Sequence, residues 1–196
     1  MELYIIRHGE TLENARNICQ GQLDGTLSPK GIEEAKAVGK RVAEIPFSAI
    51  YTSDLGRAHH TAELIHSFHR GKASLYSDKR LRERYFGSFQ GQAFPKDFST
   101  FAPPPETETP EAITERLSDF ISEISRRYRG AEEKVLLISH GFTIKVLWCL
   151  LNGSSLTMLE STTEIANTSL GIVEVKDNGF IIKMWNNTDH IKQEES

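Results

Sequence analysis

Arg7 and His8 follow the first apolar segment of the chain without a spacer. Residues 4–6, Tyr-Ile-Ile, have the composition of a buried strand, and Gly9 comes directly after the histidine. Open α/β sheets bind ligands at the carboxyl ends of parallel strands, where a rigid element can hold an imidazole ring for chemistry. A lone histidine more often ends a strand at the surface, so a site is predicted only if further groups converge there.

Two later apolar segments end in groups of the same kind. The strand expected over 49–51 runs into a polar stretch that ends in Arg57, and the apolar run Lys134–Ser139 is followed by His140 and Gly141. Neighbouring strands lie only about 4.8 Å apart, so parallel strands would bring these arginines and histidines together at one edge of the sheet. Guanidinium groups match phosphate oxygens bidentately, which predicts a pocket for a phosphate dianion.

Glu83 lies near the start of a segment over residues 82–110 that is rich in Gly, Pro, Phe and charge. We expect this segment to form a small cap over the active edge of the sheet. A protonated carboxyl group there could donate to a leaving oxygen, whereas the alternative is an exposed glutamate between Arg82 and Arg84. Five aromatic residues are expected to form the core of the cap: Phe86, Phe89, Phe94, Phe98 and Phe101.

These residues need a framework of alternating strands and helices. Ser28 followed by Pro29 predicts the start of a helix that ends just before Pro46. Apolar residues recur at helical spacing in three later segments, over about 58–68, 113–128 and 142–151. A short extended segment is expected near 75–76. The order of strands and helices predicts a mostly parallel sheet.

The C-terminal part of the chain predicts a hairpin. Strands are expected over 171–175 and 180–185, and the stretch Asp177-Asn178-Gly179 between them is a strong turn signal. The fold class that we expect is therefore α/β: a three-layer α/β/α sandwich whose mostly parallel sheet has one antiparallel edge strand. We expect one domain over residues 1–196.

Composition narrows the class of protein. Hydrophobic residues make up 38% of the chain and charged residues 26%, and no apolar run approaches the ~20 residues of a membrane span. A net charge of −4 gives no reason to expect nucleic acid as a partner. No secretion signal is recognisable, and the widely separated Cys19 and Cys149 are typical of reduced thiols, so we expect a cytoplasmic protein.

A metal site is the main alternative use of the histidines. His66 and His69 have i, i+3 spacing on an expected helix, but no acidic or thiol partner stands at ligand spacing, so no metal is predicted. These residues, with the neighbouring His59 and His60, are expected to face solvent. Two acidic residues beside the expected site are predicted to orient loops and arginines rather than to react: Glu10 and Asp54.

Several motifs together resemble the histidine phosphatase superfamily, which has the phosphoglycerate mutase-like fold. The resemblance runs nearly from end to end, and the motifs stand in the order of that family. They are Arg7-His8-Gly9-Glu10-Thr11, Asn14, Gln20-Gly21, Leu27-Ser28-Pro29-Lys30-Gly31, Thr52-Ser53-Asp54-Leu55-Gly56-Arg57-Ala58, Leu81-Arg82-Glu83-Arg84-Tyr85-Phe86-Gly87 and Ser139-His140-Gly141.

The resemblance implies a phosphohistidine intermediate, no metal and no cofactor. By motif, His8 corresponds to the nucleophile and Glu83 to the proton donor, while Arg7, Arg57 and His140 form the phosphate pocket. Further contacts to phosphate are implied for four residues: Asn14, Gln20, Gly21 and Gly141.

Phosphoryl transfer sets requirements for these side chains. His8 must present a neutral ring nitrogen to phosphorus, with the proton of its other nitrogen held by an acceptor such as a backbone carbonyl. Arg7, Arg57 and a protonated His140 could then stabilise the charge of the transition state without Mg²⁺. Glu83 would protonate the leaving alkoxide and then deprotonate the water that releases phosphate.

The sequence favours a phosphatase over a mutase. Mutases of the resembling family carry a long basic insertion between the proton donor and the last histidine, and tend to have Asn where Phe142 stands. The segment after Glu83 instead resembles fructose-2,6-bisphosphatase-like and broad-specificity phosphatases. We expect hydrolysis of a small phosphorylated metabolite: a sugar phosphate, phosphoglycerate or phosphoserine.

Two other functions stay open. One is a cofactor-dependent phosphoglycerate mutase, and the other is a phosphate-binding module without turnover, although all five catalytic positions hold competent residues. The apolar helices and the late hairpin allow a homodimer but do not distinguish it from a monomer.

Overall fold

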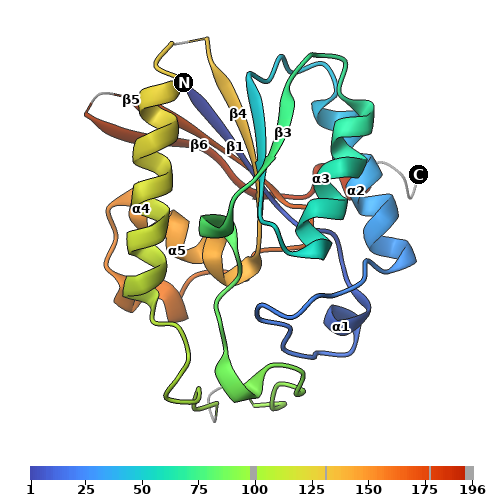
Figure 1. Cartoon of the computed structure of the whole chain (residues 1–196), viewed down its shortest axis with the longest axis vertical. Helices are drawn as coiled ribbons and strands as arrows, with labels where there is room; N and C mark the ends of the chain where they lie inside the picture. The colour runs from blue at the N-terminus through green and yellow to red at the C-terminus, as the bar shows by residue number, and fades with distance from the viewer. Residues whose placement is uncertain (98–100, 131, 177, 193–196) are drawn as a thin grey trace.

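A six-stranded sheet runs through the centre of the protein in the computed structural model, which describes residues 1–97, 101–130, 132–176 and 178–192. The strand order is β3-β2-β4-β1-β5-β6 (Figure 1). The strands are β1 (Glu2–Arg7), β2 (Ala49–Thr52), β3 (Ser74–Ser77), β4 (Lys134–Ser139), β5 (Leu170–Lys176) and β6 (Gly179–Asn187).

The sheet is parallel on one side and antiparallel on the other. β4 pairs in parallel with both β1 and β2, and β2 pairs in parallel with β3. β5 runs antiparallel to β1, and β6 closes the sheet as the outer strand of the expected hairpin. The predicted sheet is thus confirmed, with the antiparallel strand one position inside the edge. Asp177 of the expected turn lies outside the described residues, while Gly179 has a φ of 136°, which L side chains rarely adopt.

Helices cover both faces of this sheet, which confirms the three layers. They are α2 (Pro29–Val42), α3 (Gly56–Phe68), α4 (Pro110–Arg127) and α5 (Gly141–Asn152). Alternate residues of β1 point to opposite faces: Leu3 and Ile5 pack with α4 and α5, while Tyr4 and Ile6 pack with α2 and α3. Figure 1 shows α4 and α5 on one side of the sheet and α2 and α3 on the other.

The starts of two long helices follow the capping rules. The side chain of Ser28 accepts from the backbone N–H of Gly31 at 3.0 Å, and Thr109 caps α4 in the same way, each with proline at the first helical position. α2 ends at Val42, before the predicted limit at Pro46. No helix in the described ranges combines the length and apolar character that a membrane span needs.

Two short helices were not expected, α1 (Leu12–Ala15) and α6 (Asp189–Lys192). Four residues are too few for an apolar period to show in the sequence. The usable signal for α1 is a capping box, in which Thr11 and Asn14 exchange side-chain and backbone hydrogen bonds.

The cap segment lies beyond the carboxyl ends of the parallel strands, at the bottom of Figure 1. Its described part contains the 3₁₀ turn Gly87–Phe89, and four of the five expected aromatic rings pack together there; Phe98 lies outside the described residues. Backbone hydrogen bonds join Cys19 to Gln92 and Phe94 to Asn17. The cap is therefore fastened to the loop that follows α1.

Candidate active site

The ends of β1, β2 and β4 meet because these strands are neighbours in the sheet. The backbone N–H of His8 donates to Ser139 at 3.0 Å, and that of Ser53 donates to Ile138 at 3.0 Å. The rings of His8 and His140 consequently lie with their centroids 5.1 Å apart. Residues from three separate parts of the chain are thus placed side by side.

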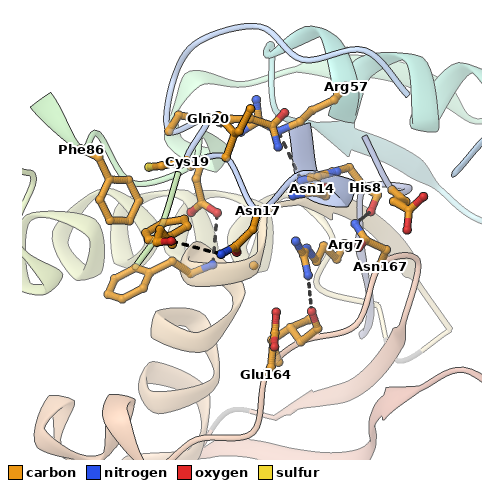
Figure 2. Close-up of a pocket in the computed structure, with 18 of the residues that line it drawn as sticks. Arg7, His8, Asn14, Asn17, Cys19, Gln20, Arg57, Phe86, Glu164 and Asn167 are labelled. Atoms are coloured by element: carbon orange, nitrogen blue, oxygen red, sulfur yellow. Dashed lines mark hydrogen bonds between the residues drawn. The ribbon is translucent and has the colours of Figure 1, made fainter. Parts of the chain in front are cut away.

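A cavity of about 600 Å³ opens at this edge of the sheet (Figure 2). His140 is fully buried and lies against His8 rather than in the cavity wall. The other eight residues expected in the site line the cavity: Arg7, His8, Asn14, Gln20, Gly21, Arg57, Glu83 and Gly141.

The hydrogen bonds of His8 determine which ring nitrogen carries the proton. Arg57 Nε lies 3.2 Å from His8 Nε2, and a guanidinium can only donate, so Nε2 holds a lone pair. The proton is therefore on Nδ1, which donates to the Gly9 carbonyl at 2.8 Å. Burial and the nearby Arg57 and Arg7 hold the pKa of His8 well below its usual value, so the ring is neutral at neutral pH. His8 thus offers an unprotonated, oriented Nε2.

Arg57 is fixed by backbone carbonyls. It is buried in the first turn of α3, and its terminal nitrogens donate to Leu23 at 2.8 Å and Gly21 at 2.7 Å. Gly21 has a φ of 53°, a left-handed conformation that suits glycine. Burial lowers the pKa of Arg57 to about 10, so the guanidinium remains charged at neutral pH.

A loop before β5 holds the end of β1, and nothing in the sequence predicted this. Arg7 donates to the Ile165 carbonyl at 2.5 Å, Asn167 donates to the His8 carbonyl at 2.9 Å, and the Thr168 N–H donates to Arg7 at 3.1 Å. Within the described part of the chain, the buried Arg7 Nε has no hydrogen-bond partner. A Cβ at Gly141 would lie 3.3 Å from this Nε, so the glycine keeps the space beside it open.

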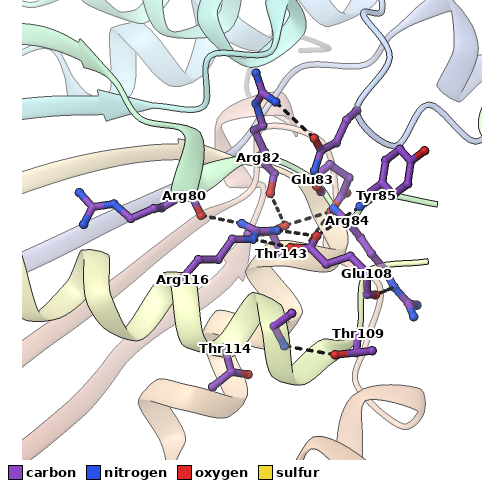
Figure 3. Close-up of polar contacts among 12 residues, drawn as sticks. Arg80, Arg82, Glu83, Arg84, Tyr85, Glu108, Thr109, Thr114, Arg116 and Thr143 are labelled. Atoms are coloured by element: carbon purple, nitrogen blue, oxygen red, sulfur yellow. Dashed lines mark hydrogen bonds and ion pairs between the residues drawn. The ribbon is translucent and has the colours of Figure 1, made fainter. Parts of the chain in front are cut away.

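Glu83 is held at the amino terminus of α5 and is not the exposed glutamate of the alternative interpretation (Figure 3). Its carboxylate accepts from the backbone N–H groups of Phe142 at 3.2 Å, Thr143 at 3.1 Å and Arg84 at 2.8 Å. The Thr143 hydroxyl lies 3.1 Å from the same carboxylate. These contacts fix the carboxyl group in the wall of the cavity, on the cap side.

His140 differs from the expected protonated donor. Its two ring nitrogens are buried and make no hydrogen bond to any described residue. Burial, together with Arg57, His8 and Arg7, holds the pKa of His140 well below its ordinary value. The ring is therefore neutral at neutral pH in the protein alone, because its surroundings are already cationic, and it supplies one N–H.

Two amide side chains complete the wall. Asn14 accepts from the Thr11 N–H at 3.2 Å through Oδ1, so the capping box of α1 orients it. The buried Gln20 Oε1 has no hydrogen-bond partner among the described residues.

Thr61, which the sequence analysis missed, accepts from the Gly9 N–H at 3.1 Å and thereby joins α3 to the loop after β1.

The neutral state of both histidines predicts a stability that depends on pH. We expect the free energy of unfolding to fall as pH decreases below about 6.5. In that range the histidines of the unfolded chain become protonated, whereas His8 and His140 stay neutral in the folded protein because their pKa values are lowered. Urea unfolding between pH 8 and pH 5 measures this slope. His140→Gln should flatten it, whereas the exposed control His60→Gln should not. Equal slopes in wild type and His140→Gln would contradict the assignment.

The remaining expectations have mixed outcomes. Glu10 accepts from Ser28 at 2.8 Å and so orients its loop, and Asp54 pairs bidentately with Arg82, at 2.7 Å to each oxygen, and so orients an arginine, as expected for both.

The expectation that all four helix histidines face solvent is wrong for two of them. His66 bonds to the Ala73 carbonyl at 3.0 Å, and His69 packs on Phe47, because both lie at the end of α3 where it meets the sheet. In the described ranges, no three His, Cys, Asp or Glu side chains are grouped as metal ligands would be.

Comparison with known proteins agrees with this geometry. Residues 3–188 match the sequence model of the histidine phosphatase superfamily (branch 1). The chain is 28% identical over 208 residues to phosphoglycerate mutase-like protein 4 of Arabidopsis thaliana, covering 98% of this chain and 87% of that protein. It is 28% identical over 210 residues to a metal-independent phosphoserine phosphatase of the same plant, covering 97% and 83%.

The fold matches as well. The solved structure of Bacillus stearothermophilus YhfR aligns with a TM-score of 0.88 and 31% sequence identity, covering 97% of this chain and 98% of that one. These matches confirm the resemblance first drawn from the motifs. The chain belongs to the histidine phosphatase superfamily, branch 1.

Proposed function

We propose that this protein is a metal-independent phosphomonoesterase that hydrolyses a small phosphorylated metabolite through a phosphohistidine at His8. The observation that carries the proposal is the state of His8: neutral, buried, with its Nδ1 proton on the Gly9 carbonyl and its Nε2 lone pair facing Arg57 at the cavity. Relatives named as phosphatases, one of them metal-independent, support the same activity.

In the first step, the Arg57 Nε–H passes from His8 Nε2 to a phosphate oxygen, and the freed lone pair of Nε2 attacks phosphorus in line with the ester oxygen. The N–P bond forms as the P–O bond breaks, and the leaving alkoxide takes a proton from the carboxyl group of Glu83. Arg7 and Arg57 stabilise the charge on the equatorial phosphoryl oxygens with N–H donors that are already oriented. The Gly9 carbonyl keeps the Nδ1 proton and so stabilises the ring as it becomes phosphorylated.

In the second step, water attacks the phosphohistidine from the face that the alcohol has left. The Glu83 carboxylate takes a proton from this water, the N–P bond breaks, and inorganic phosphate and neutral His8 are restored. Phosphate contacts are assigned to His140, Asn14, Gln20 and the Gly141 backbone. Gln20 lines the cavity, and the NH₂ group of its amide is the part that can donate to a phosphate oxygen.

Phosphate release from a panel of esters tests the proposal. We expect release from phosphoserine, 3-phosphoglycerate, fructose bisphosphate and an aryl phosphate to continue in excess chelator, because the charged donors here are arginines. The measurement is inorganic phosphate with and without EDTA. Loss of release in EDTA that returns on adding Mg²⁺ would contradict metal independence, and no release from any ester would contradict hydrolysis.

A mutase is the second candidate, since several relatives are named phosphoglycerate mutase or mutase-like. Two observations favour hydrolysis over it. Phe142, where mutases tend to have Asn, offers only its backbone N–H, which Glu83 already uses. The four arginines at 116, 126, 127 and 129 belong to α4 or its end, and Arg116 is paired with Glu108. Interconversion of 2- and 3-phosphoglycerate after priming with bisphosphoglycerate would favour the mutase.

The location and assembly of the protein are part of this proposal. We place the activity in the cytoplasm, and the buried free thiols of Cys19 and Cys149 are compatible with a reducing compartment. A homodimer and the absence of a nucleic-acid partner stay predictions.

A further inference from the structure

Lys145 is a cationic residue of the cavity to which the proposed reaction assigns no role. It lies on α5 four residues after Gly141, and both residues line the cavity. Residues four apart share one face of a helix, and helical side chains lean toward the amino terminus. Lys145 and Gly141 therefore lie on the cavity side of α5, with the lysine one turn after the glycine where the phosphate is proposed to bind.

The ammonium group of Lys145 is half-buried, and few interactions offset its loss of hydration. Its Nζ donates to the Thr162 carbonyl at 3.3 Å, and within the described part of the chain no carboxylate lies within ion-pair distance of it. Glu164, in the same cavity wall, acts on it at longer range. Burial lowers the pKa of Lys145, as expected for a cation removed from water without an anion beside it. An anionic group of a bound molecule would supply that partner.

The helix geometry limits where such an anion can lie. Four residues of helix rise by about 6 Å, so the two positions on α5 are one turn apart along the cavity. A carboxylate two or three bonds from the ester oxygen fits this spacing. The distal phosphate of a hexose bisphosphate would lie farther from the first one.

We propose that Lys145 is a specificity-determining residue that binds a substrate carboxylate close to the phosphate. The preferred substrates are then short phosphorylated hydroxy acids or amino acids rather than sugar phosphates. This inference rests on the proposed phosphatase function and names the substrate class of the same site.

Matched pairs of esters that differ in one carboxylate measure the contribution of that carboxylate to kcat/KM. Phosphoethanolamine is phosphoserine without its carboxylate, and glycerol 3-phosphate has a hydroxymethyl group where 3-phosphoglycerate has a carboxylate. We expect kcat/KM of the wild type to favour the carboxylated member of each pair by about tenfold or more, since a charge-assisted hydrogen bond contributes an effect of that order. Lys145→Met should reduce each ratio by about tenfold, and Lys145→Arg should retain most of it.

Controls separate a direct contact from a general effect. Lys36→Met removes a lysine that pairs with Glu33 on α2, outside the cavity, and should leave both ratios unchanged. A ratio unchanged in Lys145→Met, or an equal fall in kcat/KM for both members of each pair, would overturn the role of Lys145 while hydrolysis itself stands. No phosphate release by the wild type from any ester would instead overturn the proposed function and this inference together.

Discussion

Replacing His8 with alanine is expected to lower phosphate release by about 10⁴-fold or more, because the variant has no group to accept the phosphoryl transfer. In the structure, the Gly9 carbonyl accepts from Nδ1 of His8 and the Arg57 Nε–H donates to Nε2, so the two contacts orient the ring from opposite sides. The neighbouring His140 makes no such hydrogen bond to any described residue. Initial rates on phosphoserine and on an aryl phosphate measure the loss.

The matched control is His60→Ala, which removes an exposed histidine from α3. It should keep the wild-type rate. Thermal unfolding of both variants separates loss of chemistry from loss of fold. Turnover by folded His8→Ala within tenfold of the wild type would exclude His8 as the nucleophile.

Glu83→Gln is expected to affect the two half-reactions differently, depending on the leaving group of the ester. With an alkyl ester, whose leaving oxygen needs a proton, kcat should fall by about 10²–10⁴-fold. With p-nitrophenyl phosphate the phenolate leaves without a proton, so the first step should survive while attack of water on the phosphoenzyme slows. Stopped-flow absorbance should therefore show a burst of one nitrophenolate per active site, followed by slow turnover.

Glu115→Gln, on the exposed side of α4, is the control for loss of one carboxylate from this part of the chain. It should show neither the loss nor the burst. If Glu83→Gln instead lost the same factor on the alkyl and the aryl ester, with no burst, Glu83 would act through its contacts to Phe142 and Thr143 rather than as an acid and base.

The sheet and its active edge could be predicted because their signals are local. The apolar runs that become β1, β2 and β4 each end in the polar residues that they present, and parallel neighbours must place these ends together. The helix start predicted at Ser28 likewise involves residues within one turn. The cap could be predicted only as an irregular segment, because its position depends on distant backbone hydrogen bonds to the loop after α1.

The supports of the site could not be predicted because most are backbone groups. The carbonyls of Gly21, Leu23 and Ile165 orient Arg57 and Arg7, and since every residue has a backbone carbonyl, the sequence does not indicate which ones serve. For His8 a backbone carbonyl was expected as acceptor, and the structure identifies it as that of Gly9. Asn167 lies 159 positions from the His8 carbonyl that it contacts, so no short motif connects them.

The charge of His140 depends on whether phosphate occupies the pocket. Residue types alone indicate a cationic donor, but the protonation of a buried ring depends on its burial and on the combined charge of its neighbours. Here Arg57, His8 and Arg7 act together with burial to disfavour the proton. A phosphate dianion in the pocket would oppose that effect, so we expect any positive charge on His140 to arrive with the substrate.

Isolation of the phosphoenzyme tests the central claim most directly. Glu83→Gln mixed with p-nitrophenyl phosphate should be quenched in base, which preserves phosphohistidine, and the modified peptide should be located by mass spectrometry. The account predicts one phosphoryl group, labile in acid and carried by His8. A phosphoryl group on another residue, or product formation with no phosphoenzyme at any time from this variant and the wild type, would contradict it.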